Sequence, residues 1–156
     1  MTDPSSPLPP ESPAVTAHIT LLQGVINRLA NNSSSCKTWC LALVSALLSL
    51  AGATRSPAVA CFTVIPVLIF GFVDTMYLAQ EKAYRELYGR VVKAIRAQQY
   101  TLQNTFETGA PLTRNDIVHA IKSWSIWPVY GVLIAIYVVA SVYGWTPLLA
   151  VAAKAA

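Results

Sequence analysis

Three long stretches without a charged residue constrain this chain more than any other feature. Thr38–Thr54 holds 17 uncharged residues, Ser56–Val73 holds 18, and Ser123–Ala153 holds 31. A bilayer core of about 30 Å is crossed by about 20 apolar residues in a helix that rises 1.5 Å per residue. All three stretches reach this scale, the first only just. The sequence therefore predicts an all-α integral membrane protein with three transmembrane helices and amphipathic cytoplasmic helices.

The order of polar and apolar segments predicts five parts. Residues 1–14 are rich in Pro and Ser, which is typical of a disordered tail. Apolar residues at the 3.6-residue period predict an amphipathic helix at 15–35. A transmembrane hairpin follows at 36–80, a cytoplasmic helical section at 81–126, and a third transmembrane helix with a short external tail at 127–156. Nothing in the sequence forbids one continuous helix through the first helix and the first span, so that point stays open.

Lysine and arginine predict the orientation. If the N-terminus is cytoplasmic, nine of the 11 basic residues lie inside and only Arg55 and Lys154 lie outside. Cytoplasmic loops of membrane proteins carry such an excess of positive charge. The net charge of +4 is therefore interpreted as this bias and not as a sign of nucleic-acid binding. We expect a cytoplasmic N-terminus and an external C-terminus.

The sequence contains no catalytic pattern. The two histidines, His18 and His119, lie in different segments, and there is no glycine-rich phosphate loop and no HExxH. Three cysteines lie at or inside apolar runs without the further ligands that a metal site needs. The sequence thus predicts that the protein is not an enzyme and holds no metal or cofactor.

Asp74 is the most conspicuous single residue, because it lies near the inner end of the second predicted span. An ionisable group in a spanning helix is costly and is a functional candidate by default. Two interpretations are open. Asp74 is a carboxylate at the mouth or gate of a pore, or it forms an ion pair with Lys37 or Arg85 at the membrane boundary.

A line of polar residues follows the first two predicted helices. If these helices are continuous, the line forms one wet stripe, and copies of it around a symmetry axis would line a hydrated path. Otherwise its first part faces the cytosol and its last part only packs. The pore or gate candidates on this line are Gln23, Asn27, Asn31, Thr38, Ser45 and Ser49. Small residues at three-to-four spacing, which permit close helix packing in lipid, are Ala42, Ser45, Ser49 and Gly52.

A basic run predicts an anion-binding surface on the cytoplasmic side. Its members are Lys82, Arg85, Arg90, Lys93 and Arg96. One interpretation is attraction to anionic lipid. The other is binding of an anionic signal such as a nucleotide or oligonucleotide, whose bases would stack on Tyr84, Tyr88 and Tyr100.

One segment carries a family resemblance. His18–Ser33, followed by Cys36-Lys37-Thr38-Trp39, resembles a recurrent family of short bacterial membrane proteins. In these proteins a Q-x-V-I-x-R-x-A-x-N-S helix precedes a K-x-W at the start of a transmembrane hairpin. The likeness covers about Ala17–Gln80 well and the rest loosely. Some members resemble the small membrane effectors of two-gene anti-phage systems, in which a nucleotidyltransferase partner controls a pore.

The resemblance implies a multi-pass protein of the bacterial inner membrane. It implies as partners membrane lipid, further copies of the chain in a homo-oligomer, and a cytoplasmic nucleotidyltransferase or its nucleic-acid product. Three short spans cannot enclose a conduction path alone, so we expect an oligomeric channel or pore-forming effector in antiviral defence. The alternative is a non-conducting membrane adaptor that anchors a soluble partner through its amphipathic helices.

Overall fold

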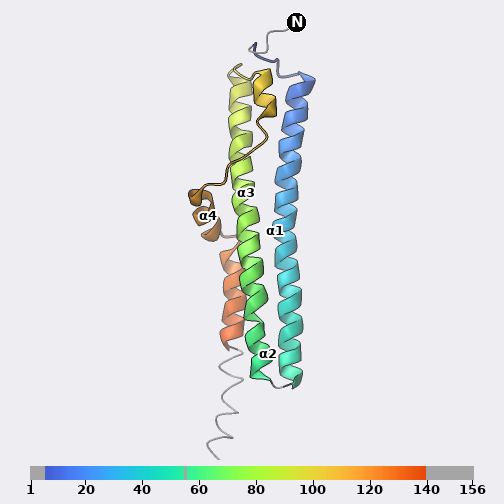
Figure 1. Ribbon diagram of the computed structural model, residues 1–156, viewed down its shortest axis with the longest axis vertical. Coiled ribbons are helices and arrows are strands. Elements are labelled where there is room, and N and C mark those ends of the chain that lie inside the picture. Colours follow the sequence, from blue (N-terminus) through green and yellow to red (C-terminus); the bar gives the residue numbers. More distant parts are fainter. Residues whose placement is uncertain (1–5, 55, 140–156) are drawn as a thin grey trace, which may run out of the picture. The chain divides into compact units, whose positions relative to one another are not determined.

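The computed structural model describes residues 6–54 and 56–139, and the regular structure in this part of the chain is helical (Figure 1). The prediction of an all-α fold is therefore confirmed. Two helical runs, Pro13–Thr54 and Val59–Arg96, are long and apolar enough to cross a membrane by length and composition. The helix of the third predicted span is described only over Trp127–Val139, and the rest of that span lies outside the described residues.

Helix α1, Pro13–Thr54, is one continuous helix of 42 residues. It begins at a proline, which suits the first helical position because the N–H that it lacks would have no partner there. The amide of Thr16 donates to the carbonyl oxygen of Ser12 at 3.1 Å and closes the first turn. The question that the sequence left open is thus answered, because the amphipathic helix and the first apolar run form a single element.

The second apolar run is divided into α2, Pro57–Phe62, and α3, Val64–Arg96. The interruption at Thr63 lies three residues before Pro66, which has no N–H to donate and disfavours the helical conformation of the residue before it. α3 then continues without a break to Arg96, as the amphipathic pattern after the second apolar run predicts. Gln98, at a φ of 54°, follows the end of α3.

Two short elements follow α3. The 3₁₀ helix η1, Leu102–Phe106, comes first. Helix α4, Arg114–Ile121, comes next. The amide and hydroxyl of Thr113 donate to Oδ2 of Asp116 at 2.8 and 2.6 Å, and the Asp116 amide donates back to the Thr113 hydroxyl at 3.3 Å. This reciprocal cap is the variant of the capping box that the sequence predicts.

The chain divides into two compact units. Unit 1 comprises Met1–Asn32 and Met76–Ala120, and unit 2 comprises Ser33–Thr75 and Ile121–Ala156. α1 and α3 each contribute residues to both units. The core of unit 1 is an apolar cluster from α1, α3 and the segment after α3, and its members are Val15, Leu22, Leu87, Val91 and Tyr100.

The proline-rich segment before α1 is held in unit 1. The amide of Leu8 donates to the carbonyl oxygen of Tyr100 at 2.7 Å, and Pro7 pairs with Thr101 in an isolated bridge. Residues 6–12 therefore differ from the disordered tail that the composition indicates, because the extended strand after α3 offers partners for their backbone groups. Residues 1–5 lie outside the described residues.

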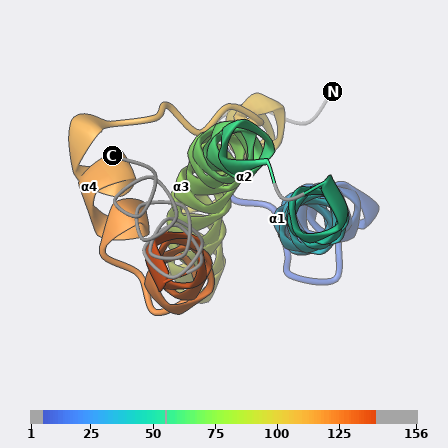
Figure 2. The same ribbon diagram turned by 90° about the horizontal axis from the view of Figure 1, so that it is seen from below.

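In unit 2, α1, α3 and the Trp127–Val139 helix pack through a narrow set of residues. The buried apolar side chains are Cys36, Cys40, Val44, Val67, Ile126, Tyr130 and Leu133. The Trp127–Val139 helix lies against the first half of α3 (Figures 1 and 2), where a Cβ on Gly71 would lie only 3.4 Å from the Tyr130 ring. The absence of a side chain at Gly71 lets this aromatic ring approach the α3 backbone closely.

Candidate functional site

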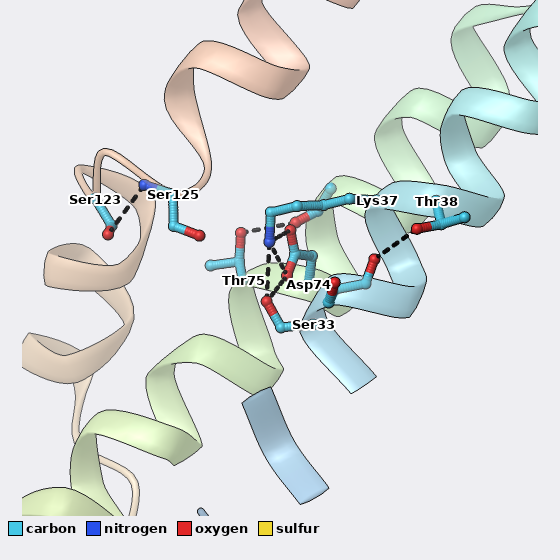
Figure 3. Close-up of polar contacts among 9 residues, drawn as sticks. Ser33, Lys37, Thr38, Asp74, Thr75, Ser123 and Ser125 are labelled. Carbon is cyan, nitrogen blue, oxygen red and sulfur yellow. Dashed lines mark hydrogen bonds and ion pairs between the residues drawn. The ribbon is translucent and has the colours of Figure 1, made fainter. Parts of the chain in front are cut away.

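Asp74 lies on α3 in unit 2, and none of its side chain is exposed. A carboxylate in such a position must be paired, because an isolated buried charge is strongly destabilising. Among the described residues its partners come from α1. The Lys37 ammonium lies 2.7 Å from Oδ2 and donates to Oδ1 at 3.0 Å (Figure 3). The structure thus selects Lys37, and not Arg85, from the two partners that the sequence left open.

Ser33 closes a ring with this ion pair. Its hydroxyl donates to Oδ1 of Asp74 at 2.5 Å and accepts a hydrogen bond from the Lys37 ammonium at 2.9 Å. Ser33 and Lys37 are four residues apart and therefore lie on one face of α1, one above the other. The Lys37 ammonium thus donates two hydrogen bonds, to Ser33 and to Oδ1 of Asp74, and forms an ion pair with Oδ2. We call these three residues the Ser33–Lys37–Asp74 ring.

The two charges of the ring differ in their access to solvent. The Lys37 side chain keeps 21% of its surface exposed, whereas Asp74 keeps none. Removing one member of a buried ion pair typically costs about 3–5 kcal/mol, because the other charge is left uncompensated. The long Lys37 stem can carry its ammonium outward, but Asp74 has no such route. Loss of Lys37 should therefore be more damaging than loss of Asp74.

Tyr130 extends the polar cluster to the third helix of unit 2. Its hydroxyl is buried and has no geometrically satisfactory hydrogen-bond partner among the described residues, yet it lies within the electrostatic reach of Asp74. The neighbouring Thr75 hydroxyl instead donates to the backbone carbonyl of Gly71 at 2.7 Å (Figure 3).

The remaining pore candidates do not join this cluster. Gln23, Asn27, Asn31, Thr38, Ser45 and Ser49 are all exposed, and so are the small residues Ala42 and Gly52. At about 100° per residue, these eight residues fall within an arc of roughly 100° on α1, opposite the buried face that carries Cys36 and Cys40. They form one continuous exposed stripe, which we call the α1 stripe. Gln23 donates to the Tyr88 hydroxyl at 3.3 Å. From Asn27 onward the stripe is exposed in the described part of the chain, so close packing through that stretch is open to another molecule.

Two hydroxyls in the apolar half of the stripe donate to carbonyl oxygens of their own helix. Thr38 donates to the Ser34 carbonyl at 3.2 Å, and Ser49 donates to the Ser45 carbonyl at 2.8 Å. Such bonds hide the donor of a Ser or Thr side chain while its oxygen can still accept. The stripe is thus compatible with an apolar surrounding as well as with water.

The basic run on α3 is only partly free. The Lys82 ammonium donates to the carbonyl oxygen of His119 at 2.9 Å, and Arg85 pairs with Glu81 at 2.6 Å. Arg90, Lys93 and Arg96 are exposed, and the last two lie in the final turn, where positive charge favours the helix dipole.

The tyrosines near the basic run face inward. Tyr100 is buried in the core of unit 1, and Tyr84 and Tyr88 pack against that core. Tyr100 therefore offers no free face to a nucleic-acid base, whereas Tyr84 and Tyr88 are partly exposed and base stacking on them stays a prediction. The 3.6-residue period places Tyr84 and Tyr88 on the apolar face of α3, whereas Tyr100 follows the end of that helix.

A second buried polar pair was not predicted from the sequence. The Tyr100 hydroxyl and Nδ1 of His18 share a hydrogen bond at 2.6 Å, while Nε2 of His18 is buried without a partner among the described residues. Burial, and then the charge of Glu107, raise the pKa of Tyr100. These residues are 82 positions apart, and no local pattern joins them. Only the position of His18 on the apolar face of α1 signals that it is buried.

The sequence matches no protein-family model, no curated protein and no solved structure. Within residues 6–54 and 56–139, no group of three His, Cys, Asp or Glu side chains could hold a metal ion. The site is thus defined by its own geometry, as a buried ion pair between two long helices and an exposed polar stripe on one of them.

Proposed function

We propose that this protein is a homo-oligomeric membrane pore in which the α1 stripes of several copies line the conducting path. The continuous α1, with its exposed polar stripe opposite a buried packing face, is the observation that carries the proposal. The resemblance in His18–Trp39 supports a further assignment. The pore would be an effector of bacterial anti-phage defence, controlled by a cytoplasmic nucleotidyltransferase or its nucleic-acid product.

The surface of unit 2 supports insertion into a bilayer. In the two long helices, only 17% and 22% of the most apolar windows are buried, whereas the core helix of a soluble protein is mostly buried. Large apolar side chains are exposed on each long helix of unit 2, among them Leu50 on α1, Phe72 on α3 and Val139 on the third helix. Soluble monomers rarely expose contiguous apolar surface on this scale. We therefore assign unit 2, with three spans, to the membrane.

Exposed tryptophans support a boundary near the Ser33–Lys37–Asp74 ring. Trp39 follows Lys37 by two residues, and Trp127 precedes Tyr130 by three, so each lies within about 5 Å of the ring's level along its own helix. Both side chains are exposed, as in the aromatic belts of membrane proteins. From Lys37 to Thr54, α1 would then cross the apolar core with about 26 Å of helix.

The charge distribution supports a cytoplasmic unit 1. Seven of the 11 Lys and Arg residues belong to the sequence ranges of unit 1, and the positive-inside rule places such a section in the cytoplasm. The N-terminus would then be cytoplasmic and the C-terminus, after a third span, external. In a bacterium this arrangement corresponds to the inner membrane.

The length of α3 limits which basic residues can reach lipid. Arg90 and Arg96 lie roughly 24 and 33 Å beyond Asp74 along the helix axis. Even at a tilt of about 40° they stay roughly 18 and 25 Å from the boundary, while a salt solution screens charge over about 8 Å. We therefore assign a soluble anionic signal to Arg90, Lys93 and Arg96, whereas Lys82 is engaged by the His119 carbonyl oxygen and Arg85 by Glu81.

Current through a planar bilayer tests the pore directly. The purified protein should carry current, and Ser45→Leu should abolish or strongly reduce it, because a bulky apolar side chain blocks close approach and dries the path. Ala46→Leu makes the same addition on the exposed surface about 100° away and is the matched control. Crosslinking in membranes should show oligomers for the wild type and for Ala46→Leu.

The alternative function, a membrane adaptor, predicts that the protein carries no current. Its support is the exposed far end of unit 1, where Phe106 is 79% exposed and Arg90, Lys93 and Arg96 are free to meet a soluble partner. An adaptor carries no current under any condition, including in the presence of a nucleotidyltransferase partner. Absence of current from a crosslinkable oligomer would thus favour the adaptor and contradict the pore.

A further inference from the structure

Within unit 2, the Ser33–Lys37–Asp74 ring joins α1 to α3 close to where both helices enter this unit. Ser33 is the first residue of unit 2 on α1, and Asp74 is one residue from its last position on α3. The other buried apolar side chains of α1 in unit 2 are Cys36, Cys40 and Val44, and the Cys40 thiol lies 3.9 Å from the Pro66 carbonyl oxygen. The ring is thus the strongest directional contact between α1 and α3 in the described part of unit 2.

The arrangement is suited to switching. In the closed ring Lys37 donates to Oδ1 of Asp74 and to Ser33, and its ammonium lies 2.7 Å from Oδ2 and compensates the buried charge. If Lys37 withdraws, a carboxylate remains that has no exposure at all, and an uncompensated buried charge is strongly unfavourable. Separation of α1 from α3 would let water reach Asp74 and relieve that cost. A state with the ring open and the helices still tightly packed is therefore disfavoured, which leaves two states, closed and separated.

We propose that the Ser33–Lys37–Asp74 ring is a releasable latch between α1 and α3, and that its release opens the pore. The second clause rests on the proposed function, whereas the latch itself does not. Asp74 thereby acts on the gate as a positioning residue and does not line the path. The α1 stripe lies on the opposite face of α1, so separation of α1 from α3 would change how neighbouring stripes meet.

Native cysteines provide the test of the latch. Cys36 and Cys40 are buried on the α1 face that packs within unit 2, whereas Cys61 is exposed. In a Cys61→Ser background, the rate at which N-ethylmaleimide labels Cys36 and Cys40 in reconstituted protein measures separation of the packed helices. Mass spectrometry after proteolysis assigns the label to each thiol.

The exposed fractions of the Lys37 and Asp74 side chains predict the order of the labelling rates among the variants. Lys37→Gln should raise the labelling rate by roughly tenfold or more, because it strands the buried carboxylate. Asp74→Asn should raise it less, because the Lys37 ammonium can reach water. The double variant Lys37→Gln/Asp74→Asn leaves no buried charge and should return to within about twofold of the wild type. Arg28→Gln, which removes an exposed cation from the same helix, is the control and should have no effect.

Two results would overturn the latch. One is a wild-type labelling rate in Lys37→Gln, and the other is a double variant that labels as fast as the faster single variant. If Lys37→Gln does not accumulate, Ser33→Ala decides, because it keeps both charges and removes only the hydroxyl. Ser33→Ala should raise labelling about two- to fivefold, and an unchanged rate would exclude the latch.

Bilayer currents separate the latch from the pore. Lys37→Gln should conduct more than the wild type, and the double variant should conduct like the wild type. A labelling series in the expected order without any current would retain the latch and refute the pore. If a substitution raises the labelling rate but leaves the current unchanged, release of the latch does not open the pore.

Discussion

At the scale of single residues, each unit contains a buried polar contact that joins segments far apart in the sequence. The Asp74–Lys37 pair joins α1 and α3 in unit 2, and the Tyr100–His18 hydrogen bond joins α1 to the segment after α3 in unit 1. Tyr100 also accepts the Leu8 amide on its carbonyl oxygen. It therefore fixes both the segment before α1 and the start of α1.

Tyr100→Phe should destabilise the attachment of the segment before α1 and of the start of α1 to Tyr100. The substitution leaves Nδ1 of His18 buried without a partner, which costs about 1–3 kcal/mol. Hydrogen exchange at the Leu8 amide should accelerate roughly tenfold or more. Tyr84→Phe, at a half-buried tyrosine of the same core, is the matched control. Equal exchange rates in both variants would mean that the hydrogen bond contributes nothing.

The same residue predicts an alkaline limit. Its pKa is raised from the ordinary value of 10.0, first by burial and then by Glu107. A group whose folded-state pKa is raised contributes stability that is present below the unfolded value and lost as the pH rises through the folded value. The protection factor of the Leu8 amide, which removes the intrinsic rise of exchange with pH, should therefore fall above about pH 10 in the wild type and not in Tyr100→Phe.

At the scale of elements, the continuity of α1 is the main addition of the structure to the sequence. Asn31–Ser35 is polar and offers several caps, so periodicity alone did not decide between one helix and two. Ser33 resolves the question physically, because its hydroxyl is used in the ring with Lys37 and Asp74 and does not cap a new helix. Local patterns could not show this, since the acceptor comes from a residue 41 positions away.

Local patterns sufficed where the partners are close in sequence. The cap of α4 joins Thr113 and Asp116 across three residues, and the Glu81–Arg85 pair spans four. Both follow from the sequence. The partners of Ser33 and His18 depend on tertiary packing, and so does the inward direction of Tyr84 and Tyr88.

The α4 cap gives a prediction for acid pH. Hydrogen bonds from the Thr113 side chain and backbone lower the pKa of Asp116 from 3.8. A carboxyl group whose folded pKa is depressed contributes stability that is present above the unfolded value and lost as the pH falls through the folded value. Asp116→Asn should lower the protection factors of the amides in the first turn of α4 at neutral pH. In the wild type, acid below about pH 3.8 should lower the same protection factors, once the intrinsic pH dependence of exchange is removed. Asn115→Ala, at its exposed neighbour, should not, and an unaffected α4 in Asp116→Asn would disprove the cap.

At the scale of the whole molecule, the two units differ in where they carry charged residues and exposed apolar side chains. Unit 1 carries most of the basic residues and a conventional apolar core. Unit 2 exposes its apolar side chains and buries its charge pair. The all-α class and the two long apolar helices follow from the uncharged runs. The pairing of charge within unit 2 and the isolation of the α1 stripe follow only from how the helices pack.

The accessibility of α1 to water in the membrane tests the central claim most directly. In a cysteine-free background, Ser45→Cys and Ser49→Cys lie on the stripe, and Leu43→Cys and Leu50→Cys lie on the exposed apolar surface, about 100° or more from both serines. A charged thiosulfonate applied to reconstituted protein should label the two stripe positions and block the current, and should leave the two leucine positions unlabelled. Equal labelling at all four positions, or labelling at none, would contradict a pore lined by the α1 stripe.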